Sequence, residues 1–200
     1  MFTGIIQAIG QIKTKDTHDK GAVFSFASDE LDFSNVAIGD SIAVNGVCLT
    51  AVEISDNSFK ADLSQETLDC SIFGDLSVDD TVNLEKSLRL NQGIDGHLVS
   101  GHVDGQGEVV GKTIEGKSTR FQISTPKNLV KYIARKGSIT MNGVSLTVNN
   151  IDANVFDVNI VPHTLTATTL GRLGVGSQVN LEVDIIARHL EQLLNNNKSQ

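Results

Sequence analysis

Short runs of alternating or β-branched residues recur along the chain and predict a mostly β protein. In the first half these runs are residues 22–27, 41–44, 49–54, 58–63 and 81–84. Alternation with a period of two places every second side chain on the buried face of a sheet. Turn signals such as Asn-Gly separate the runs, and the second half repeats each of them. Many short strands in a small unit predict a closed barrel, because closure leaves no exposed strand edge.

Two short segments change to helical spacing. Residues 128–134 bring Leu129, Val130 and Ile133 together, and residues 31–37 are a weaker counterpart in the first half. Apolar residues at such spacing are typical of a helix with one buried face. We therefore expect one short helix in each half.

A longer helix is expected near the C-terminus, outside the strand pattern. Residues 184–194 begin with Asp184, a candidate N-cap. An apolar stripe must be buried, either on its own barrel or against another subunit, and both alternatives stay open here. The stripe consists of Ile186, Leu190, Leu193 and Leu194.

The chain consists of two similar halves. Residues 41–85 align without a gap on residues 138–182, so each position is matched by the one 97 residues later. More than a third of these aligned positions are identical. Solenoid repeats are ~20–50 residues long, so this longer period indicates two homologous domains. The expected units are two domains at 1–97 and 98–185, with a boundary in the turn-rich stretch 91–96, and a C-terminal helix and tail at 186–200.

Composition limits the classes of function. The 200 residues include 16 Lys and Arg against 24 Asp and Glu, which gives a formal net charge of −8. An acidic protein lacks the basic surface that nucleic acids and anionic membranes require, so we expect neither as a partner. No apolar run approaches the ~20 residues of a membrane helix. Residues 1–6 lack the charged and apolar order of a signal peptide, so we expect a cytoplasmic protein.

Reactive residues that occur in only one half are the best candidates for chemistry, since shared residues serve the common fold. Cys48 opens a predicted strand; it is either a nucleophile activated by a nearby cation or base, or an inert core residue. His102 is a candidate acid or base near neutral pH. The positions matched across the halves are Cys48 with Ser145, His102 with Ile5, Lys136 with Gly39, Glu66 with His163, and Asp184 with Ser87.

Disulfides, metal sites and phosphate sites find no support in the sequence. Cys48 and Cys70 are too few for a disulfide framework and form no C-x-x-C pair. His97 and His102 have no third ligand in local spacing that would mark a metal site. The glycine-rich stretch around them lacks the order of a phosphate loop. We therefore expect no metal and no cofactor.

Four motifs stand in a fixed order along the repeat. They are Met-Phe-Thr-Gly-Ile-Ile-Gln at 1–7, Asn-Gly-Val-Cys-Leu-Thr at 45–50, Gly-His-Leu-Val-Ser-Gly-His at 96–102 and Asn-Gly-Val-Ser-Leu-Thr-Val at 142–148. Together with the gapless repeat, they closely resemble the riboflavin synthase family of the trimeric, two-barrel type. The resemblance covers essentially the whole chain.

The resemblance implies an all-β fold of two tandem, homologous six-stranded Greek-key barrels, with short helices and a C-terminal α-helix that helps to form a homotrimer. It implies a transferase that dismutates two molecules of 6,7-dimethyl-8-ribityllumazine by four-carbon transfer. The products are riboflavin and 5-amino-6-ribitylamino-2,4(1H,3H)-pyrimidinedione. It also implies an active site where the N-terminal barrel of one subunit faces the C-terminal barrel of another. Association with lumazine synthase is a further partnership that we consider.

Transferred by position, the resemblance gives each barrel one set of lumazine contacts. The first set is Gly4, Ile5, Ile6, Cys48, Leu49, Thr50, Asp62, Leu63, Ser64, Gln65, Glu66 and Thr67. The second set is Gly101, His102, Val103, Lys136, Ser145, Leu146, Thr147, Asn159, Ile160, Val161, Pro162, His163 and Thr164. Apart from Lys136, the second set is the first displaced by 97 residues, which fits one ligand in each barrel.

The resemblance and the unmatched residues together suggest catalytic roles. One lumazine must lose a proton from its 7-methyl group and the other must be attacked at C7, so the two ligands need different surroundings. We expect Cys48, or a water that it assists, to attack or shield C7 of the acceptor. We expect His102 to move the methyl proton, helped by Ser41. Thr147 and Asp184 would orient the second ligand or stabilise charge, and backbone amides of residues 62–67 and 159–164 would hold the pteridine rings.

Three other readings compete with this one. A lumazine- or flavin-binding antenna protein of the same fold would be expected to lose Cys48 or His102. A flavin domain of an oxidoreductase would need an Arg-containing phosphate motif and a nicotinamide domain. A purely structural repeat would not explain reactive groups at turns and strand starts. Two residues depart from the family pattern without being expected to abolish activity: His163, where Glu is frequent, and Asp95, where Gly is usual.

Overall fold

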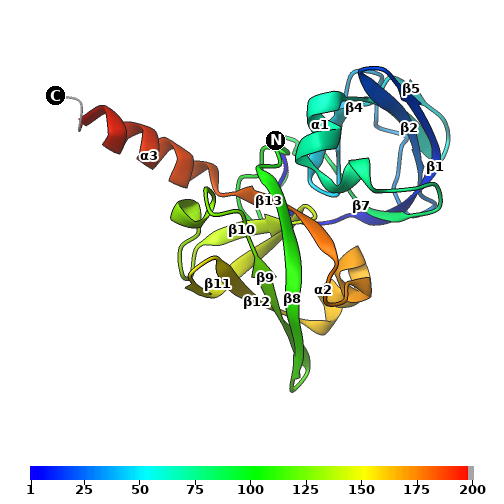
Figure 1. Cartoon of the computed structure of the whole chain (residues 1–200). Coiled ribbons are helices and arrows are strands. Elements are labelled where there is room, and N and C mark those ends of the chain that lie inside the picture. The colour runs from blue at the N-terminus through cyan, green and yellow to red at the C-terminus, as the bar shows by residue number, and fades with distance from the viewer. Residues whose placement is uncertain (198–200) are drawn as a thin grey trace.

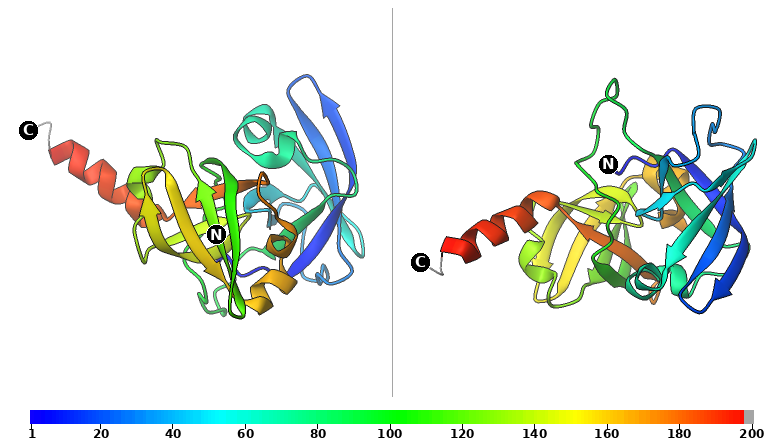
Figure 2. Two further views of the ribbon diagram at one scale, coloured as in Figure 1. Left: turned by 60° about the horizontal axis from the view of Figure 1, so that its bottom comes forward. Right: turned by 90° about the horizontal axis from the view of Figure 1, so that it is seen from above.

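The fold consists of two β units and a C-terminal helix, α3 (Ile185–Asn197), which projects away from both (Figures 1 and 2). This computed structural model describes residues 1–197, with side chains for residues 1–195. The first unit contains β1 (Ala8–His18), β2 (Gly21–Ala27), β3 (Ser41–Val44), β4 (Val47–Thr50), β5 (Glu53–Ile54), β6 (Ser58–Ser64) and β7 (Thr81–Lys86). The second contains β8 (Gly105–Glu115), β9 (Ser118–Ser124), β10 (Ser138–Met141), β11 (Val144–Asp152), β12 (Val155–Ile160) and β13 (Gln178–Val183).

The two units share one barrel topology. The second is a closed six-stranded barrel in the order β10-β11-β12-β9-β8-β13, and the first has the corresponding order with β4 and β5 at its two ends. These two strands are consecutive parts of one strand, because only residues 51 and 52 separate them and Val52 N donates to Lys60 O across β6. Their counterpart, β11, is uninterrupted. The expectation of two six-stranded Greek-key barrels is thus confirmed, with one strand divided in the first.

Each barrel buries its own apolar core. Five rings meet in the first barrel, namely Phe24, Phe26, Phe33, Phe59 and Phe73. The rings of Phe24 and Phe73 stand edge to face, with centroids 5.6 Å apart. The second core holds Phe121 and Phe156 among aliphatic side chains. Burying a side chain of this size stabilises a fold by roughly 1.5–3 kcal/mol, so each unit has enough core to fold around.

Neither of the two expected short helices forms as predicted. In residues 31–37 Asp32 Oδ1 accepts a hydrogen bond of 2.9 Å from Ser34 N, and the segment is a series of turns. Such local side-chain bonds compete with helical ones. Residues 128–134 contain a single 3-10 turn, η2 (Val130–Tyr132). The helical spacing there reflects a few buried contacts and not a helix.

Short helices instead follow the fifth strand of each barrel, with β4 and β5 counted as one strand. α1 (Gln65–Cys70) follows β6 and leads into the 3-10 turn η1 (Ile72–Gly74); α2 (Pro162–Ala167) follows β12 and leads into η3 (Thr169–Arg172). Ser64 caps α1, since its Oγ accepts from Thr67 N at 3.2 Å. Pro162 opens α2, where a fixed φ suits the first turn. Residues 62–67 and 159–164 are therefore strand-to-helix junctions.

An approximate twofold axis relates the two barrels, and residues 97 positions apart meet on it. Phe2 and Val99 exchange backbone hydrogen bonds of 2.7 and 3.0 Å. The two Asn-Gly turns also meet there. A Cβ built on Gly46 would lie 2.7 Å from Gly143 N, and a Cβ on Gly143 would lie 2.7 Å from Gly46 N. Only glycine at both positions permits this approach.

Four buried asparagines join the barrels around the axis: Asn45, Asn83, Asn142 and Asn180. Asn83 Nδ2 donates to Asn142 O, and Asn180 Nδ2 donates to Asn45 O, both at 2.9 Å. The Oδ1 atoms of Asn83 and Asn180 accept 2.8 Å bonds from backbone N–H groups of η3 and η1, respectively. Because every bond has a counterpart 97 residues away, this network fixes the relative orientation of the barrels.

The C-terminal helix begins as expected but leaves its apolar stripe uncovered. Asp184 Oδ1 accepts from Ile186 N at 2.9 Å, which confirms the N-cap. At its middle the helix is tied to η2, where Glu191 pairs with Lys131 and Tyr132. The idea that the helix packs its stripe on its own barrel is wrong, because all four stripe residues are at least 55% exposed.

Candidate active site

A cavity beside Cys48 combines residues of both repeats. Its volume is about 240 Å³. The first repeat contributes the start of β4 and one side of α1, and the second contributes the segment just before β8. Six of the residues that line it were expected to contact lumazine: Cys48, Glu66, Thr67, Gly101, His102 and Val103.

The second-repeat segment reaches this cavity because it hydrogen-bonds to β4. Cys48 N donates to Gly101 O at 2.8 Å. The two backbones are so close that a Cβ on Gly101 would lie 2.5 Å from Cys48 Cβ. The approach places His102, which is exposed, in the lining of the same cavity as Cys48. Cys48 is a partly buried free thiol and Cys70, which also lines the cavity, is exposed.

The same arrangement recurs around Ser145, with the repeats exchanged. Ser145 N donates to Gly4 O at 2.8 Å, as Cys48 N does to Gly101 O. Here the connection between the barrels adds a group that the Cys48 side lacks. Ser145 Oγ lies 2.7 Å from His97 Nδ1. Gly96 permits this contact, since a Cβ there would lie 2.9 Å from Ser145 Cβ.

The imidazole of His97 is suited to remain neutral. Burial lowers the pKa of His97 below its usual value, and the nearby charge of Asp184 opposes this only in part. A neutral imidazole next to a hydroxyl can accept its proton, which is how histidine activates serine in other enzymes. The sequence analysis did not assign a role to His97, and the only signal was its place in the Gly-His-Leu-Val-Ser-Gly-His motif.

The expected assignment of contacts to barrels needs one correction. Gly4, Ile5 and Ile6 were grouped with Cys48, and Gly101, His102 and Val103 with Ser145. The backbone hydrogen bonds join Gly4 to Ser145 and Gly101 to Cys48 instead. The reason is the twofold axis, which brings the segment before each barrel against the strand β4 or β11 of the other barrel. Each candidate site is therefore built from both repeats.

The remaining candidates are spread around these two centres. Ser41 lies opposite Thr50 where β3 pairs with β4, and it does not line the cavity beside Cys48. Thr147, the counterpart of Thr50, lies opposite Ser138 where β10 pairs with β11, and it is exposed. Asp184 caps α3. Lys136 is an exposed turn residue before β10.

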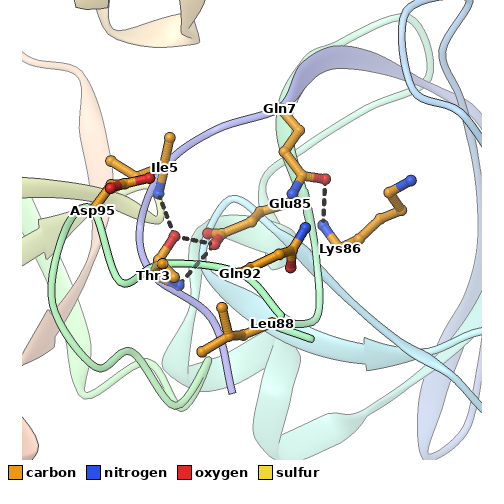
Figure 3. Close-up of a pocket in the computed structure, with 9 residues that line it drawn as sticks. Thr3, Ile5, Gln7, Glu85, Lys86, Leu88, Gln92 and Asp95 are labelled. Atoms are coloured by element: carbon orange, nitrogen blue, oxygen red, sulfur yellow. Dashed lines mark hydrogen bonds between the residues drawn. The ribbon is translucent and has the colours of Figure 1, made fainter. Parts of the chain in front are cut away.

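The strand-to-helix junctions at residues 62–67 and 159–164 have the same backbone conformation but carry different side chains. In the first repeat Glu66 and Thr67 line the cavity beside Cys48. In the second repeat, His163 occupies the place of Glu66 in α2 and is exposed. The departure noted at His163 therefore replaces an acid with an imidazole at the Ser145 side. Asp95, the other departure, lines a cavity of about 220 Å³ beside Thr3 (Figure 3).

A buried glutamate lies behind each of the two segments that cross between the barrels. In Figure 3 the carboxylate of Glu85 points at Thr3. In the second barrel, Glu182 occupies the equivalent place next to Ser100. Burial raises the pKa of both carboxyl groups above the usual value, against several hydrogen bonds that lower it. Neither glutamate was among the site residues expected from the sequence. The available signal was an acid that follows the buried residues Val82 and Leu84 of a strand and is repeated 97 residues later.

Residues 1–197 contain neither a metal-ligating cluster nor a helix that could span a membrane. No cluster of three or more His, Cys, Asp or Glu side chains in this range is arranged to hold a metal ion. No helix in the described part of the chain is both long and apolar enough to cross a bilayer.

Known proteins resemble the chain over almost its whole length. The profile of the Lumazine binding domain matches twice, at residues 3–87 and 100–184. The riboflavin synthase of Photobacterium phosphoreum is 46% identical, over 97% of this chain and 89% of that protein. The riboflavin synthase of Bacillus subtilis is 34% identical, over 100% of this chain and 94% of that protein.

Solved structures agree with these matches. The crystal structure of LumP complexed with riboflavin has a TM-score of 0.85 and 29% identity, and covers 92% of this chain and all of that one. LumP complexed with 6,7-dimethyl-8-(1'-D-ribityl) lumazine has a TM-score of 0.83 at the same identity. The repeated barrel, the composite cavity beside Cys48 and the full-length relatives lead to one conclusion: this chain belongs to the riboflavin synthase family.

Proposed function

We propose that this protein is a transferase that makes riboflavin from two molecules of 6,7-dimethyl-8-ribityllumazine. Four carbons pass from one lumazine to the other, which leaves 5-amino-6-ribitylamino-2,4(1H,3H)-pyrimidinedione as the second product. The observation that carries the proposal is the cavity that Cys48 and His102, contributed by different repeats, line together. The full-length relatives named riboflavin synthase support the same reaction.

On the Cys48 side, the thiol and the imidazole are the reactive groups. Cys48, or a water that it assists, attacks or shields C7 of the acceptor lumazine. His102 moves the proton of the 7-methyl group, since it is exposed and lines the same cavity as Cys48. Ser41 acts only indirectly in this scheme, through its pairing with Thr50 on β4.

On the Ser145 side, we assign a proton-transfer role to the Ser145–His97 pair. The 2.7 Å contact and the lowered pKa of His97 suit a base that works through a hydroxyl. Thr147 and Asp184 orient the second lumazine or stabilise charge there. The two ligands then meet different groups on one repeated scaffold, as the unequal roles of donor and acceptor require.

A complete site needs a second subunit in this proposal. The cavity beside Cys48 holds about 240 Å³, whereas small-molecule sites usually enclose about 300–1,000 Å³. The uncovered stripe on α3 supplies a surface for self-association, and we propose a homotrimer. We propose residues 1–97 and 98–185 as lumazine-binding domains, and residues 186–200 as the trimerisation segment, of which 198–200 lie outside the described residues. We also place the enzyme in the cytoplasm, with lumazine synthase as a candidate partner.

The decisive experiment is to incubate the purified protein with 6,7-dimethyl-8-ribityllumazine and follow both products by chromatography. We expect riboflavin and the pyrimidinedione in equal amounts. The alternative is a non-catalytic lumazine- or flavin-binding antenna protein, which the similarity to LumP favours. Tight binding of the lumazine without formation of either product would establish that alternative and reject the proposed function.

A further inference from the structure

Two buried glutamates hold the segments that cross between the barrels. Glu85 and Glu182 are each 3% exposed. Glu182 Oε1 accepts from Ser100 N and Ser100 Oγ, both at 2.7 Å, and Oε2 accepts from Gly101 N at 2.9 Å. Glu85 makes the equivalent bonds to Thr3 N, Thr3 Oγ1 and Gly4 N, at 2.7, 2.8 and 3.1 Å. Both oxygens of each carboxylate therefore accept hydrogen bonds from the segment.

These contacts continue to the candidate site residues of the opposite barrel. Ser100 Oγ also accepts from His102 N at 3.2 Å, and Gly101 O accepts from Cys48 N at 2.8 Å. One carboxylate on β13 thus fixes the backbone that presents His102 and covers Cys48. In the other half, Glu85 on β7 fixes Gly4, whose carbonyl accepts from Ser145 N at 2.8 Å.

We infer that Glu182 and Glu85 are positioning residues, each of which aligns one ligand site across the repeat boundary. Glu182 sets the Cys48–His102 site, and Glu85 sets the Ser145 site. Neither carboxylate needs to touch a ligand, because its oxygens are directed at backbone N–H groups and a hydroxyl. The expected effect on turnover rests on the proposed function. The expected effect on the backbone around Cys48 does not depend on it.

A carboxylate is required because every donor in the segment needs an acceptor. In Glu182→Gln one oxygen becomes an NH₂ group, so two donors face each other at Gly101 N or at Ser100. A buried donor left without an acceptor disfavours the observed arrangement. The segment is then expected to loosen around Cys48 while the barrel, with its separate core, stays folded.

The first test measures the reactivity of Cys48 directly. In a Cys70→Ala background Cys48 is the only thiol, because the chain has two cysteines. Reaction with iodoacetamide is followed by mass spectrometry. Because Gly101 packs against Cys48, we expect Glu182→Gln to raise the alkylation rate at least about threefold, and Glu85→Gln to change it by less than about 1.5-fold. Equal rates for both variants, whether raised or unchanged, would overturn the inference.

The second test separates the two kinetic constants in the lumazine reaction. Both variants are expected to raise KM, since each disturbs one ligand site. Glu182→Gln is expected to lower kcat at least about tenfold and more than Glu85→Gln does, because its segment carries His102. Equal kcat values for the two variants would contradict the assignment. If the parent protein makes no riboflavin, the proposed function fails while the alkylation test still decides the geometric claim.

A milder pair of variants covers the case in which Glu182→Gln does not fold. Ser100→Ala removes one donor to Glu182 and the acceptor for His102 N. Thr3→Val removes the equivalent hydroxyl beside Glu85. Ser100→Ala should raise the alkylation rate of Cys48 in the same direction as Glu182→Gln but less, and Thr3→Val should not. The reverse order would reject the inference.

Discussion

The surroundings of Cys48 and of Ser145 have the same backbone arrangement but differ in nearly every reactive side chain. The second residue of each strand, β4 or β11, donates its N–H to a glycine carbonyl from the other repeat, and each glycine segment is held by a buried glutamate. On one side the reactive groups are a thiol and an exposed imidazole. On the other they are a hydroxyl and a partly buried imidazole contributed by the connection between the barrels.

This difference separates scaffold from chemistry. What the halves share lies at the axis: the paired Asn-Gly turns, the four asparagines and the two glutamates. What they do not share lies at the openings of the two sites. A reaction between two identical molecules in unlike roles needs such a division, because a fully symmetric protein would offer both molecules the same groups. Four predictions test how far the two halves are equivalent.

The largest effect is expected where the Asn-Gly turns touch. Gly46→Ala and Gly143→Ala each force a Cβ within 2.7 Å of backbone nitrogen at a positive φ. We expect each to lower the free energy of unfolding in urea by about 4 kcal/mol, from backbone strain and overpacking together. Gly174→Ala, which meets nothing within 4 Å, is the control. If the two substitutions lowered the free energy of unfolding by very different amounts, the two turns would not contribute equally to the contact on the axis.

A smaller loss of stability is expected at the buried asparagines. Asn83→Ala and Asn180→Ala each remove two cross-barrel hydrogen bonds and leave buried partners unsatisfied. We expect each to lower the free energy of unfolding by about 2 kcal/mol. Asn57→Ala, at an exposed asparagine, should stay within about 0.5 kcal/mol of the parent. If either substitution lowered the free energy of unfolding as little as Asn57→Ala does, the asparagine network would not hold the two barrels together.

The reactive groups are compared by making the Cys48 side resemble the Ser145 side. We expect Cys48→Ser to lower kcat for riboflavin formation at least about tenfold, equivalent to about 1.4 kcal/mol, because a hydroxyl is a weaker nucleophile than a thiol. Lumazine affinity, measured by fluorescence titration, should change much less. His102→Gln should lower kcat as well. Full turnover in both variants would remove Cys48 and His102 from the mechanism.

The smallest effect concerns the pH dependence of stability. Burial lowers the pKa of His97 below its ordinary value of 6.5. The unfolded chain then binds this proton at a higher pH than the folded protein does, so the contribution of His97 is present above about pH 6.5 and is lost as the pH falls through the folded pKa. We expect His97→Gln to reduce the loss of unfolding free energy between about pH 7.5 and pH 5 by less than about 1 kcal/mol. The exposed His18, replaced in His18→Gln, is the control; a steeper loss in His97→Gln would reverse the expected sign.

The sequence was sufficient for some of this architecture and insufficient for the rest. Strand alternation, the Asn-Gly turns and the Asp184 cap depend on neighbouring residues, so they could be predicted locally. The prediction of helices at 31–37 and 128–134 was wrong, because turns such as the one from Asp32 to Ser34 produce similar apolar spacing. The exchange of Gly4 and Gly101 between barrels left no trace in the repeat. A segment displaced by 97 residues looks the same whether it serves its own barrel or the other one.

The self-paired contacts on the axis have an evolutionary consequence. Phe2 meets Val99 and Gly46 meets Gly143, so each contact joins a position to its own copy. Contacts of this kind characterise isologous dimers of identical chains. Duplication and fusion of the gene for one such chain would leave the axis intact and free each copy to change its side chains separately. The chain thus has the outline of an isologous homodimer with its two protomers joined, one half carrying a thiol and the other an imidazole-linked hydroxyl.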